Sequence, residues 1–255
     1  MSPTEAGLLG GREFLKCSRW REWEASPTDQ RLGLPHPPLG KPTPPDARLY
    51  DLVPPEETRL GAMPVAEAMA RRRSRRRFTP EPLSLDELSF LLWATQGVHE
   101  VFRGGLATRR VVPSGGARHP FETYLLINRV TDLGPGLYRY LALDHKLCFL
   151  RSDDSLAVGL EEACMDQGFA SKGAVAFIWS VVPYRTEWRY TIVSPKIIAL
   201  DAGHVCQNLY LACEAIGAGT CAIGAYDQGK LDTLLGLDGQ EEFSIYVAPV
   251  GKVAE

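Results

Sequence analysis

The stretch that decides the fold is Leu137-Tyr138-Arg139-Tyr140-Leu141-Ala142-Leu143-Asp144-His145-Lys146-Leu147-Cys148-Phe149-Leu150. Two runs rich in residues that favour β-structure, 137–141 and 146–150, flank a short polar link around Asp144, and this pattern predicts a β-hairpin. The turn sequence Leu133-Gly134-Pro135-Gly136 separates the hairpin from the segment before it. A hairpin pairs antiparallel strands, so we expect a mixed or antiparallel sheet.

More strands are predicted on both sides of the hairpin. The segment 122–127 is rich in aromatic and β-favouring residues, and 243–250 predicts a last strand. The segment 174–182 is almost continuously apolar, which predicts a strand that is buried on both faces.

Helices are interspersed with these strands. Ser84-Leu85-Asp86-Glu87 forms a capping box, and the helix that it opens is expected to end at Gly97. A long helix is expected over 197–216, closed by Gly217. No G-x-G-x-x-G sequence opens a helix, which argues against a doubly wound dinucleotide-binding fold. The fold class is therefore α+β, with helices flanking a mixed or antiparallel sheet.

The chain divides into an N-terminal extension, residues 1–60, and a folded domain, residues 61–255. Pro64 suits the first turn of that domain's first helix. Prolines are dense between Pro27 and Pro55, so neither a helix nor a central strand is expected there. A short helix is expected over 12–24. The extended arm either lies across a partner subunit or is a loosely attached tail.

Composition limits the functions that the chain can have. The 255 residues carry a formal charge of -3 and 45% apolar residues, which gives no overall attraction to nucleic acid or to anionic lipid. No apolar run is long enough for a membrane helix, and the N-terminus lacks a secretory pattern, so we expect no membrane span and a cytoplasmic protein.

The cysteines and histidines do not form a recognisable metal motif. The chain has no C-x-x-C pair and no histidine spacing that is typical of a metal site, so we expect no metal. We interpret the thiols as small buried apolar groups. They are Cys17, Cys148, Cys164, Cys206, Cys213 and Cys221.

The segment Arg71–Arg77 contains six arginines and one serine. Guanidinium groups bind phosphate oxygens bidentately, so a phosphate-bearing ligand would relieve the mutual repulsion of these charges. The alternative is a solvated face that pairs with Glu81, Asp86 and Glu87. A nucleic-acid patch is the third interpretation, but no second basic cluster supports it.

Two loops of small residues could approach a planar ligand through their backbone. Pro113-Ser114-Gly115-Gly116-Ala117 combines two glycines with a hydroxyl, and Cys221-Ala222-Ile223-Gly224-Ala225-Tyr226-Asp227 offers backbone N–H groups. The alternatives are a tight turn for the first loop and close packing for the second. Asp227 is expected to cap a helix that runs through Leu234.

Trp188-Arg189-Tyr190 sets a phenol beside a permanent cation. A fixed positive charge favours the phenolate, which would make Tyr190 a general base. Arg189 itself remains protonated and cannot serve as the base. The alternative is a structural role for these residues in a strand or loop.

Taken in order, these segments resemble the nitroreductase-like flavoproteins, specifically the SagB/ThcOx-type dehydrogenase branch. The segments that carry the resemblance are RRSRRRF at 72–78, RVVPSGGA at 110–117, PGLYRY at 135–140, LDAGHVCQNLYL at 200–211 and AIGA at 222–225. The resemblance covers residues 61–252. It implies a nitroreductase-like α+β fold, an intertwined homodimer and FMN in each of two sites at the subunit interface.

The resemblance also assigns cofactor-binding residues. Arg72, Ser74 and Arg76, with Arg73 in the same motif, would hold the phosphate, ribityl and pyrimidine parts of FMN. Backbone groups of Gly224 and Ala225 would lie near N5, and Lys252 would add a phosphate contact. The remaining cofactor residues would come from the other subunit: Pro113, Ser114 and Gly115.

The sequence departs from the branch at Arg189, because azoline-oxidising relatives usually carry Lys-Tyr at this dipeptide. Tyr190 remains the candidate base, with Arg189 as its electrostatic helper or as a clamp for a substrate carboxylate. Arg185 also resembles a family position and is expected in or beside the catalytic site.

The function that the resemblance implies is an FMN-dependent dehydrogenase that moves hydride from a C–H bond of a small-molecule or peptide-derived substrate to flavin N5, with azoline oxidation as one example. An NAD(P)H-dependent nitro or quinone reductase is the alternative enzyme. An accessory protein that binds flavin or peptide without turnover is the alternative outside enzymes. The dehydrogenase and the accessory protein would each work with a biosynthetic partner protein.

Overall fold

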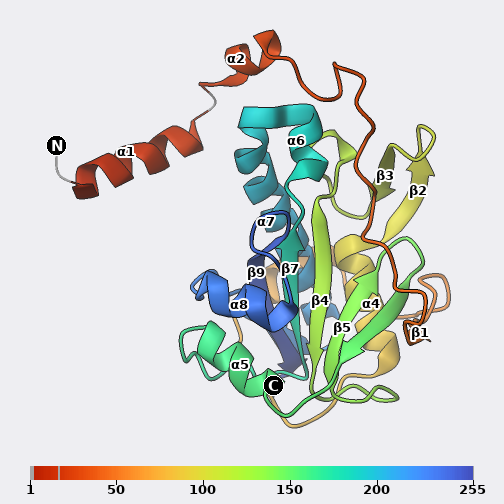
Figure 1. Cartoon of the computed structure of the whole chain (residues 1–255). Helices are drawn as coiled ribbons and strands as arrows, with labels where there is room; N and C mark the ends of the chain where they lie inside the picture. The colour runs from red at the N-terminus through yellow and green to blue at the C-terminus, as the bar shows by residue number, and fades with distance from the viewer. Residues whose placement is uncertain (1–2, 17, 255) are drawn as a thin grey trace.

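A computed structural model describes residues 3–16 and 18–254 and is organised around one antiparallel sheet (Figure 1). In this described part the sheet has seven strands in the order β1-β6-β5-β4-β7-β9-β8, and each neighbouring pair is antiparallel. The strands are β1 (Leu49–Asp51), β4 (Phe121–Ile127), β5 (Gly136–Leu141), β6 (Lys146–Arg151), β7 (Val175–Val181), β8 (Ala218–Thr220) and β9 (Phe243–Lys252). The predicted hairpin is β5–β6, and the predicted α+β class with helices flanking the sheet is confirmed.

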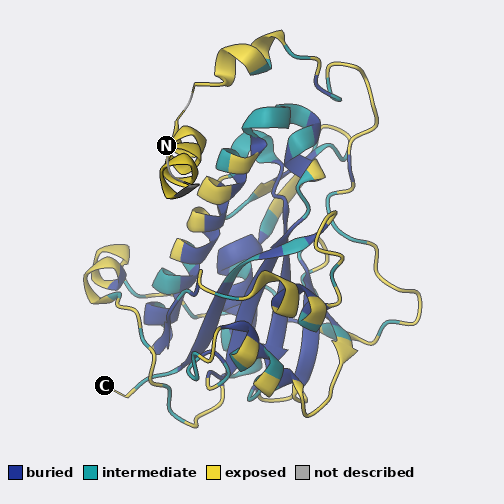
Figure 2. Ribbon diagram, turned by 60° about the vertical axis from the view of Figure 1, so that its left-hand side comes forward, coloured by how far each residue is buried: buried dark blue, intermediate teal, exposed yellow. Residues whose placement is uncertain are grey.

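The two central strands, β4 and β7, are buried along their whole length, as the apolar run at 174–182 predicts. They pair in register from Phe121 opposite Val181 to Ile127 opposite Val175. Because side chains alternate along a strand, Leu125 and Ile127 face one layer of the core, and Tyr124 and Leu126 face the other. Figure 2 shows this buried sheet beneath helices whose outer faces are exposed.

Helices cover both faces of the sheet. The helices α4 (Leu85–Gln96) and α7 (Ser194–Ala215) pack on one face. The helices α5 (Leu156–Ala163) and α8 (Gln228–Leu235) pack on the other. Shorter elements complete the described fold: α3 (Val65–Arg71), α6 (Tyr184–Tyr190), the 3-10 turns η1 (Gly115–Ala117) and η2 (Thr191–Val193), and a separate ribbon of β2 (Val98–Phe102) and β3 (Ala107–Arg110).

Local capping signals place several helix ends as predicted. The Ser84 hydroxyl accepts from the Glu87 backbone N–H, and the Glu87 carboxylate accepts from the Ser84 N–H, so the capping box is confirmed. Asp227 caps α8 by accepting from the Lys230 N–H at 2.9 Å. The long helix α7 begins at Ser194, three residues before its predicted start, because Pro195 fits the first turn.

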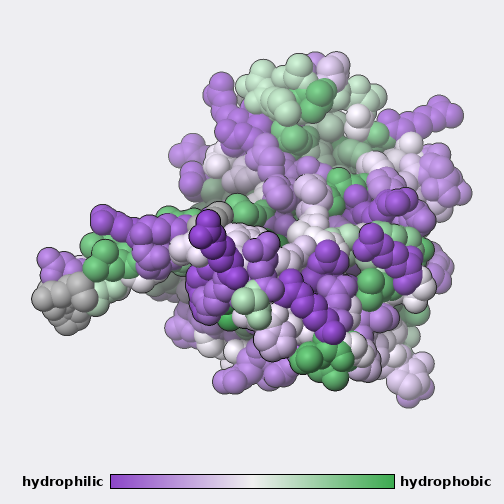
Figure 3. All heavy atoms as spheres, turned by 90° about the horizontal axis from the view of Figure 1, so that it is seen from above, coloured by the Kyte–Doolittle hydropathy of each residue, from purple (hydrophilic) through white to green (hydrophobic). Residues whose placement is uncertain are grey.

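The single helix predicted over 12–24 is wrong. The chain forms α1 (Pro3–Leu15) and α2 (Trp20–Ala25) instead, with Cys17 between them outside the described residues. Tertiary contact sets the direction of α2, since the Trp23 indole N–H donates to the Arg189 carbonyl oxygen at 3.0 Å. Figure 3 shows α1 projecting from the body with apolar atoms on its surface.

The proline-rich arm lies along the sheet of its own chain. Its strand β1 is an edge strand of the sheet and pairs with β6, which agrees with the expectation that no central strand forms there. The Lys41 N–H donates to the Glu122 carboxylate at 2.9 Å, and the Lys41 ammonium pairs with the buried Glu242. These contacts contradict the interpretation of this part of the arm as a loosely attached tail.

The five described cysteines are buried and unpaired, as predicted, and Cys17 lies outside the described residues. Burial raises the pKa of the Cys164 thiol to about 11. Among residues 3–16 and 18–254, no group of three or more His, Cys, Asp or Glu side chains is placed to hold a metal ion. No helix in these same ranges is long and apolar enough to cross a membrane.

Candidate functional site

The predicted cofactor residues gather in two groups at different heights along α7. The first group surrounds Tyr210, near the C-terminal end of this helix. The Ser74 and Tyr210 hydroxyls lie 3.2 Å apart, and the Tyr210 hydroxyl accepts from the Ala222 N–H at 2.9 Å. The Arg72 guanidinium lies over the Tyr210 ring, 5.5 Å from its centroid. Tyr210 therefore joins the arginine segment to the loop before Gly224.

The arginine segment after α3 is extended and lies beside β8. The Arg75 N–H donates to the Thr220 carbonyl oxygen at 2.8 Å, and Gly219 permits this approach because a Cβ there would lie 2.7 Å from the Arg75 Cβ. Among the described residues, the ion pairs of the segment belong to Arg71, which contacts Glu67 and Glu214. The pairing with Glu81, Asp86 and Glu87 that was the alternative interpretation is therefore not formed within that part of the chain.

The other predicted cofactor residues near this group differ in their surroundings. Gly224 and Ala225 are exposed, and open space adjoins the Gly224 backbone where a side chain would stand. The Ala225 carbonyl oxygen accepts from Gln167 at 2.9 Å. Lys252 is already engaged, because its ammonium pairs with Glu87 and donates to the Ile216 carbonyl oxygen at 2.9 Å.

The second group surrounds Asp201, nearer the N-terminal end of α7. The Ser114 hydroxyl donates to the Asp201 carboxylate at 2.6 Å, and the Gly115 N–H donates to it at 3.1 Å. Burial raises the pKa of Asp201, and these hydrogen bonds oppose the increase. Pro113 is exposed at the start of the loop. The buried Asp201 carboxylate thus holds the loop through Ser114 and Gly115, while Pro113 is exposed to solvent.

The glycines of this loop allow it to contact Tyr190 and α7. A Cβ on Gly115 would lie 2.3 Å from Ile197 Cγ2, and one on Gly116 would lie 2.8 Å from the Tyr190 hydroxyl. Gly116 also has a φ of +62°, which disfavours residues with side chains. Within one chain, Gly115 and Gly116 therefore lie in a tight turn, which was the alternative to ligand approach for this loop, and their lack of side chains lets it pack closely on Tyr190 and α7.

The segment Trp188–Tyr190 is the end of α6, whereas the alternative interpretation had placed it in a strand or loop. The Arg189 guanidinium lies 5.4 Å from the centroid of the Tyr190 ring, so the predicted pair is adjacent. Both residues are half-buried. The helix ends abruptly, because Thr191 adopts a φ of +41°. The structure therefore brings Tyr190, Arg189 and the loop of Ser114 together.

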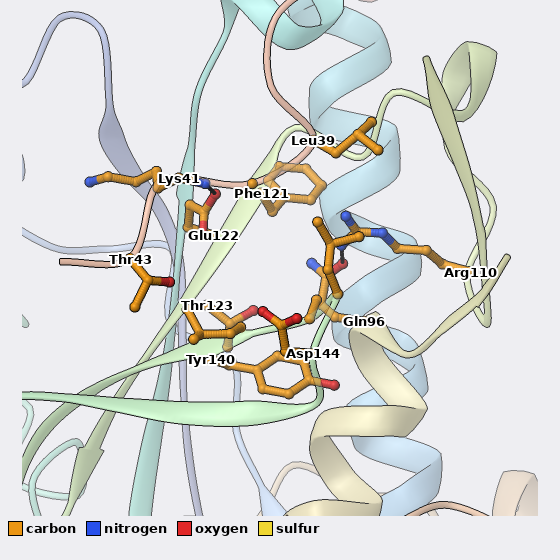
Figure 4. A pocket seen from close by; sticks show the side chains of 14 residues that line it. Leu39, Lys41, Thr43, Gln96, Arg110, Phe121, Glu122, Thr123, Tyr140 and Asp144 are labelled. Carbon is orange, nitrogen blue, oxygen red and sulfur yellow. Dashed lines mark hydrogen bonds between the residues drawn. The ribbon is translucent and has the colours of Figure 1, made fainter. Parts of the chain in front are cut away.

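Arg185 lies inside the fold. Its side chain is 3% exposed and forms an ion pair with Glu122, which also accepts from the Lys41 N–H. Glu122 borders a small cavity of about 50 Å³ under the proline-rich arm, together with Arg110 and Gln96 (Figure 4). Burial and the nearby Arg185 lower the pKa of Arg110 to about 10. This cavity is too small for a planar cofactor, and Arg185, in the first turn of α6, is buried in its ion pair with Glu122.

The two groups do not converge within one chain. Asp201 and Tyr210 are nine residues apart on one helix, which corresponds to about 14 Å along its axis at 1.5 Å per residue. Neither residue had been assigned a role from the sequence, although both lie in the motif at 200–211. Helical periodicity predicts which residues share a face, but it does not predict which loop each of them contacts.

Comparisons with known proteins place this fold and these motifs in one family. The model of the nitroreductase family matches residues 69–252, and the chain belongs to that family. A protein of Methanocaldococcus jannaschii named "Putative nitroreductase MJ1384" is 30% identical over 189 residues, which cover 74% of this chain and 91% of that protein. The chain is thus an oxidoreductase of the nitroreductase family.

Two further comparisons extend this result. The trifolitoxin-processing protein TfxB of Rhizobium leguminosarum bv. trifolii is 28% identical over 166 residues, and the match covers 62% of this chain but only 44% of TfxB. The crystal structure of a putative nitroreductase from Ralstonia eutropha superposes on this chain with a TM-score of 0.67. The two sequences are 27% identical. That superposition covers 87% of this chain and 95% of the other.

Proposed function

We propose that the chain is an FMN-dependent dehydrogenase of the SagB/ThcOx-type branch that acts as a homodimer. The separation of the two groups along α7 carries this proposal. Each group is a half-site, and the Tyr210 half-site of one subunit would meet the Asp201 half-site of its partner across one flavin. A twofold axis would then generate two equivalent sites.

The residues of the Tyr210 half-site fit a phosphate-bearing planar cofactor. Arg72, Arg73 and Arg76 form no ion pair within the described residues, and the Arg75 Nε is buried without a hydrogen-bond partner there. Guanidinium groups with free donors suit phosphate oxygens. Open backbone at Gly224 suits the edge of a flavin ring, where N–H groups stabilise the reduced form.

The Asp201 half-site would supply the proton chemistry. Bound FMN would supply the hydride acceptor, its N5 atom. Amino-acid side chains do not provide such an acceptor. Tyr190 would take the proton from the adjacent acidic X–H group, and the Arg189 cation would stabilise the phenolate. Because Gly116 contacts the Tyr190 hydroxyl, the proton acceptor and the Ser114 loop would come from the same subunit.

We further propose a peptide-derived substrate, made with the help of a biosynthetic partner protein. The name of TfxB as a toxin-processing protein supports this part, although TfxB is more than twice as long as the matched region. The second candidate is NAD(P)H-dependent reduction of nitro compounds or quinones, which the name of the archaeal relative favours. Rapid reduction of bound flavin by NADPH with turnover of nitroaromatics would support the second candidate. Indifference to NADPH would remove it.

An FMN titration of the purified protein tests the proposal. We expect Arg72→Ala to weaken FMN binding about tenfold to a hundredfold, because each hydrogen bond to a charged group contributes about 1.5–3 kcal/mol. Arg71→Ala is the matched control, since Arg71 pairs with Glu67 and Glu214, and it should bind FMN like the wild type. A colourless protein that binds no added FMN would contradict the flavin proposal outright.

A further inference from the structure

The N-terminal segment 20–34 is fixed against α6, next to Tyr190. The Gln30 N–H donates to the Trp188 carbonyl oxygen at 2.9 Å, and the Trp188 indole donates back to the Leu34 carbonyl oxygen at 3.0 Å. The Tyr184 hydroxyl donates to Asp29 at 2.8 Å. With the hydrogen bond from Trp23 to Arg189, these contacts hold the segment in place at both ends of α6.

Two tryptophans of α2 enclose the Tyr190 ring. Trp23 lies 5.9 Å from Tyr190 at an interplanar angle of 31°, and the Arg31 guanidinium lies 4.5 Å from the Trp23 ring. Trp20 meets the rings of Tyr190 and Trp23 edge-on, at 6.1 and 5.2 Å. Trp23 is therefore occupied by Tyr190 and Arg31, whereas Trp20, 37% exposed, still presents surface to the outside.

Trp20 borders an apolar groove of about 570 Å³ between the N-terminal helices and the start of α7. The apolar lining comprises Phe14, Trp20, Ile192, Val193, Pro195, Ile197 and Leu200. Ile197 also touches Gly115, so the groove is continuous with the Asp201 half-site through Ile197 and with Tyr190 through Trp20. A groove of this size is within the range of small-molecule sites, about 300–1,000 Å³.

Charge limits what this groove can bind. Its described lining carries three cationic side chains. Lys16 pairs with Glu13 of the same lining, Arg19 pairs with Glu22 of α2, and the Lys196 ammonium donates to the Leu15 carbonyl oxygen. Three cations against the two carboxylates of Glu13 and Glu22 leave one net positive charge at the rim, and an apolar floor with that charge complements a ring that bears an acidic group. Aromatic side chains such as Trp20 favour planar rings, which they contact in stacked or edge-on geometry.

We infer that Trp20 is a specificity-determining residue that binds the planar ring of an anionic substrate beside Tyr190. This inference rests on the proposed function, since it gives that reaction an aromatic or azoline carboxylate as the class of substrate. The N-terminal extension is then a wall of the reaction site. Trp23 and Arg31 have a different role, because they hold Tyr190 and Trp20 in position.

Binding of 4-nitrobenzoate, a planar anionic probe, tests the inference by isothermal titration calorimetry. We expect Trp20→Leu to weaken binding fivefold to tenfold, about the contribution of one aromatic pair, and Trp20→Phe to weaken it about twofold. Leu32→Ala is the matched control, because Leu32 is 63% exposed on the same segment and lies outside the groove lining. Non-planar cyclohexanecarboxylate and neutral 4-nitrobenzyl alcohol should both bind more weakly than the probe.

Two results would overturn the inference. One is a wild type that does not bind 4-nitrobenzoate, or that binds cyclohexanecarboxylate equally well. The other is Trp20→Leu binding the probe like the wild type, which would place the probe elsewhere, for example on the flavin. The titration with 4-nitrobenzoate is repeated without FMN. A protein that does not bind flavin would count against the proposed function. The dependence of probe binding on Trp20 would still decide the role of the groove.

Discussion

His119 is a buried histidine that the structure keeps neutral. Its side chain is 4% exposed, and burial, helped by the charge of Arg110, lowers its pKa from 6.5 to about 3. In the unfolded chain the same ring takes up a proton near its ordinary pKa. The unfolded state therefore binds more protons between pH 6.5 and pH 3, and this contribution to stability falls as the pH falls through that window.

We predict that His119→Asn removes this pH dependence. Asparagine tolerates the φ of +45° at this position, so the backbone can be kept. Urea unfolding at pH 7 and pH 5 should show the wild type losing about 2 kcal/mol more than the variant does. His99→Asn, at an exposed position, should lose as much as the wild type. An equal loss in the wild type and His119→Asn would refute the neutral, buried state.

Gly116 is the residue on which the contact between the Ser114 loop and Tyr190 depends. Gly116→Ala combines a left-handed backbone with a Cβ placed 2.8 Å from the Tyr190 hydroxyl and 3.0 Å from the Arg189 Cδ. Gly104→Ala is a control for the backbone alone, because Gly104 has a similar φ of +64° and no atom within 4 Å. In urea unfolding, we expect Gly116→Ala to cost about 1–3 kcal/mol more than the control. Equal losses would mean that Tyr190 moves aside freely.

At the scale of elements, α4 owes its start to two reciprocal hydrogen bonds between Ser84 and Glu87. Removing the serine hydroxyl leaves the Glu87 N–H without its acceptor, so Ser84→Ala should lower the free energy of unfolding by about 1 kcal/mol. Ser155→Ala is the comparison, because Ser155 precedes α5 without a capping hydrogen bond, and its exposed hydroxyl donates to the surface carboxylate of Asp153 instead. If both variants lose the same stability in urea, the capping box does not stabilise α4.

The elements that the sequence predicts are those with local signals. The hairpin β5–β6, the buried strand β7 and the capped helices α4 and α8 depend on alternation, apolar runs or caps, which can be read within one segment. The strand β1 could not be predicted, because its three residues become a strand only by pairing with β6. The break between α1 and α2 escaped prediction for the same reason, since contact between Trp23 and α6 determines where α2 lies.

The candidate site follows the same rule. Motifs identified the Ser114 loop, the arginine segment and Tyr190, because each is a compact stretch of unusual composition. Their partners could not be found in this way. Asp201 and Tyr210 are ordinary positions of a long helix until the fold brings Ser114 and Ser74 to them. Trp20 is more than 160 residues away from Tyr190 in sequence, and only the path of the arm brings the rings together.

At the scale of the whole molecule, the Tyr210 and Asp201 groups lie at different positions along α7, and this separation makes the proposed dimer of two half-sites testable. Arg72→Ala would damage the Tyr210 half-site. Pro113→Glu would damage the other half-site, because it adds a charge at an exposed position of the Ser114 loop. If each flavin lies between subunits, a mixed dimer of the two variants has one site with both defects and one site with none.

We therefore predict that mixing the two variants restores part of the FMN binding that each variant has lost. After subunit exchange under mild denaturant, random pairing makes half of the dimers mixed, so about one quarter of all sites should be intact. Flavin absorbance after desalting measures FMN bound per chain, and mixtures of each variant with itself are the control. If each chain instead bound FMN alone, every chain in the mixture would keep one defect, and the bound FMN would equal the average of the separate variants. That result would rule out a site shared between subunits, while the contacts at Tyr210 and Asp201 would remain to be explained within one chain.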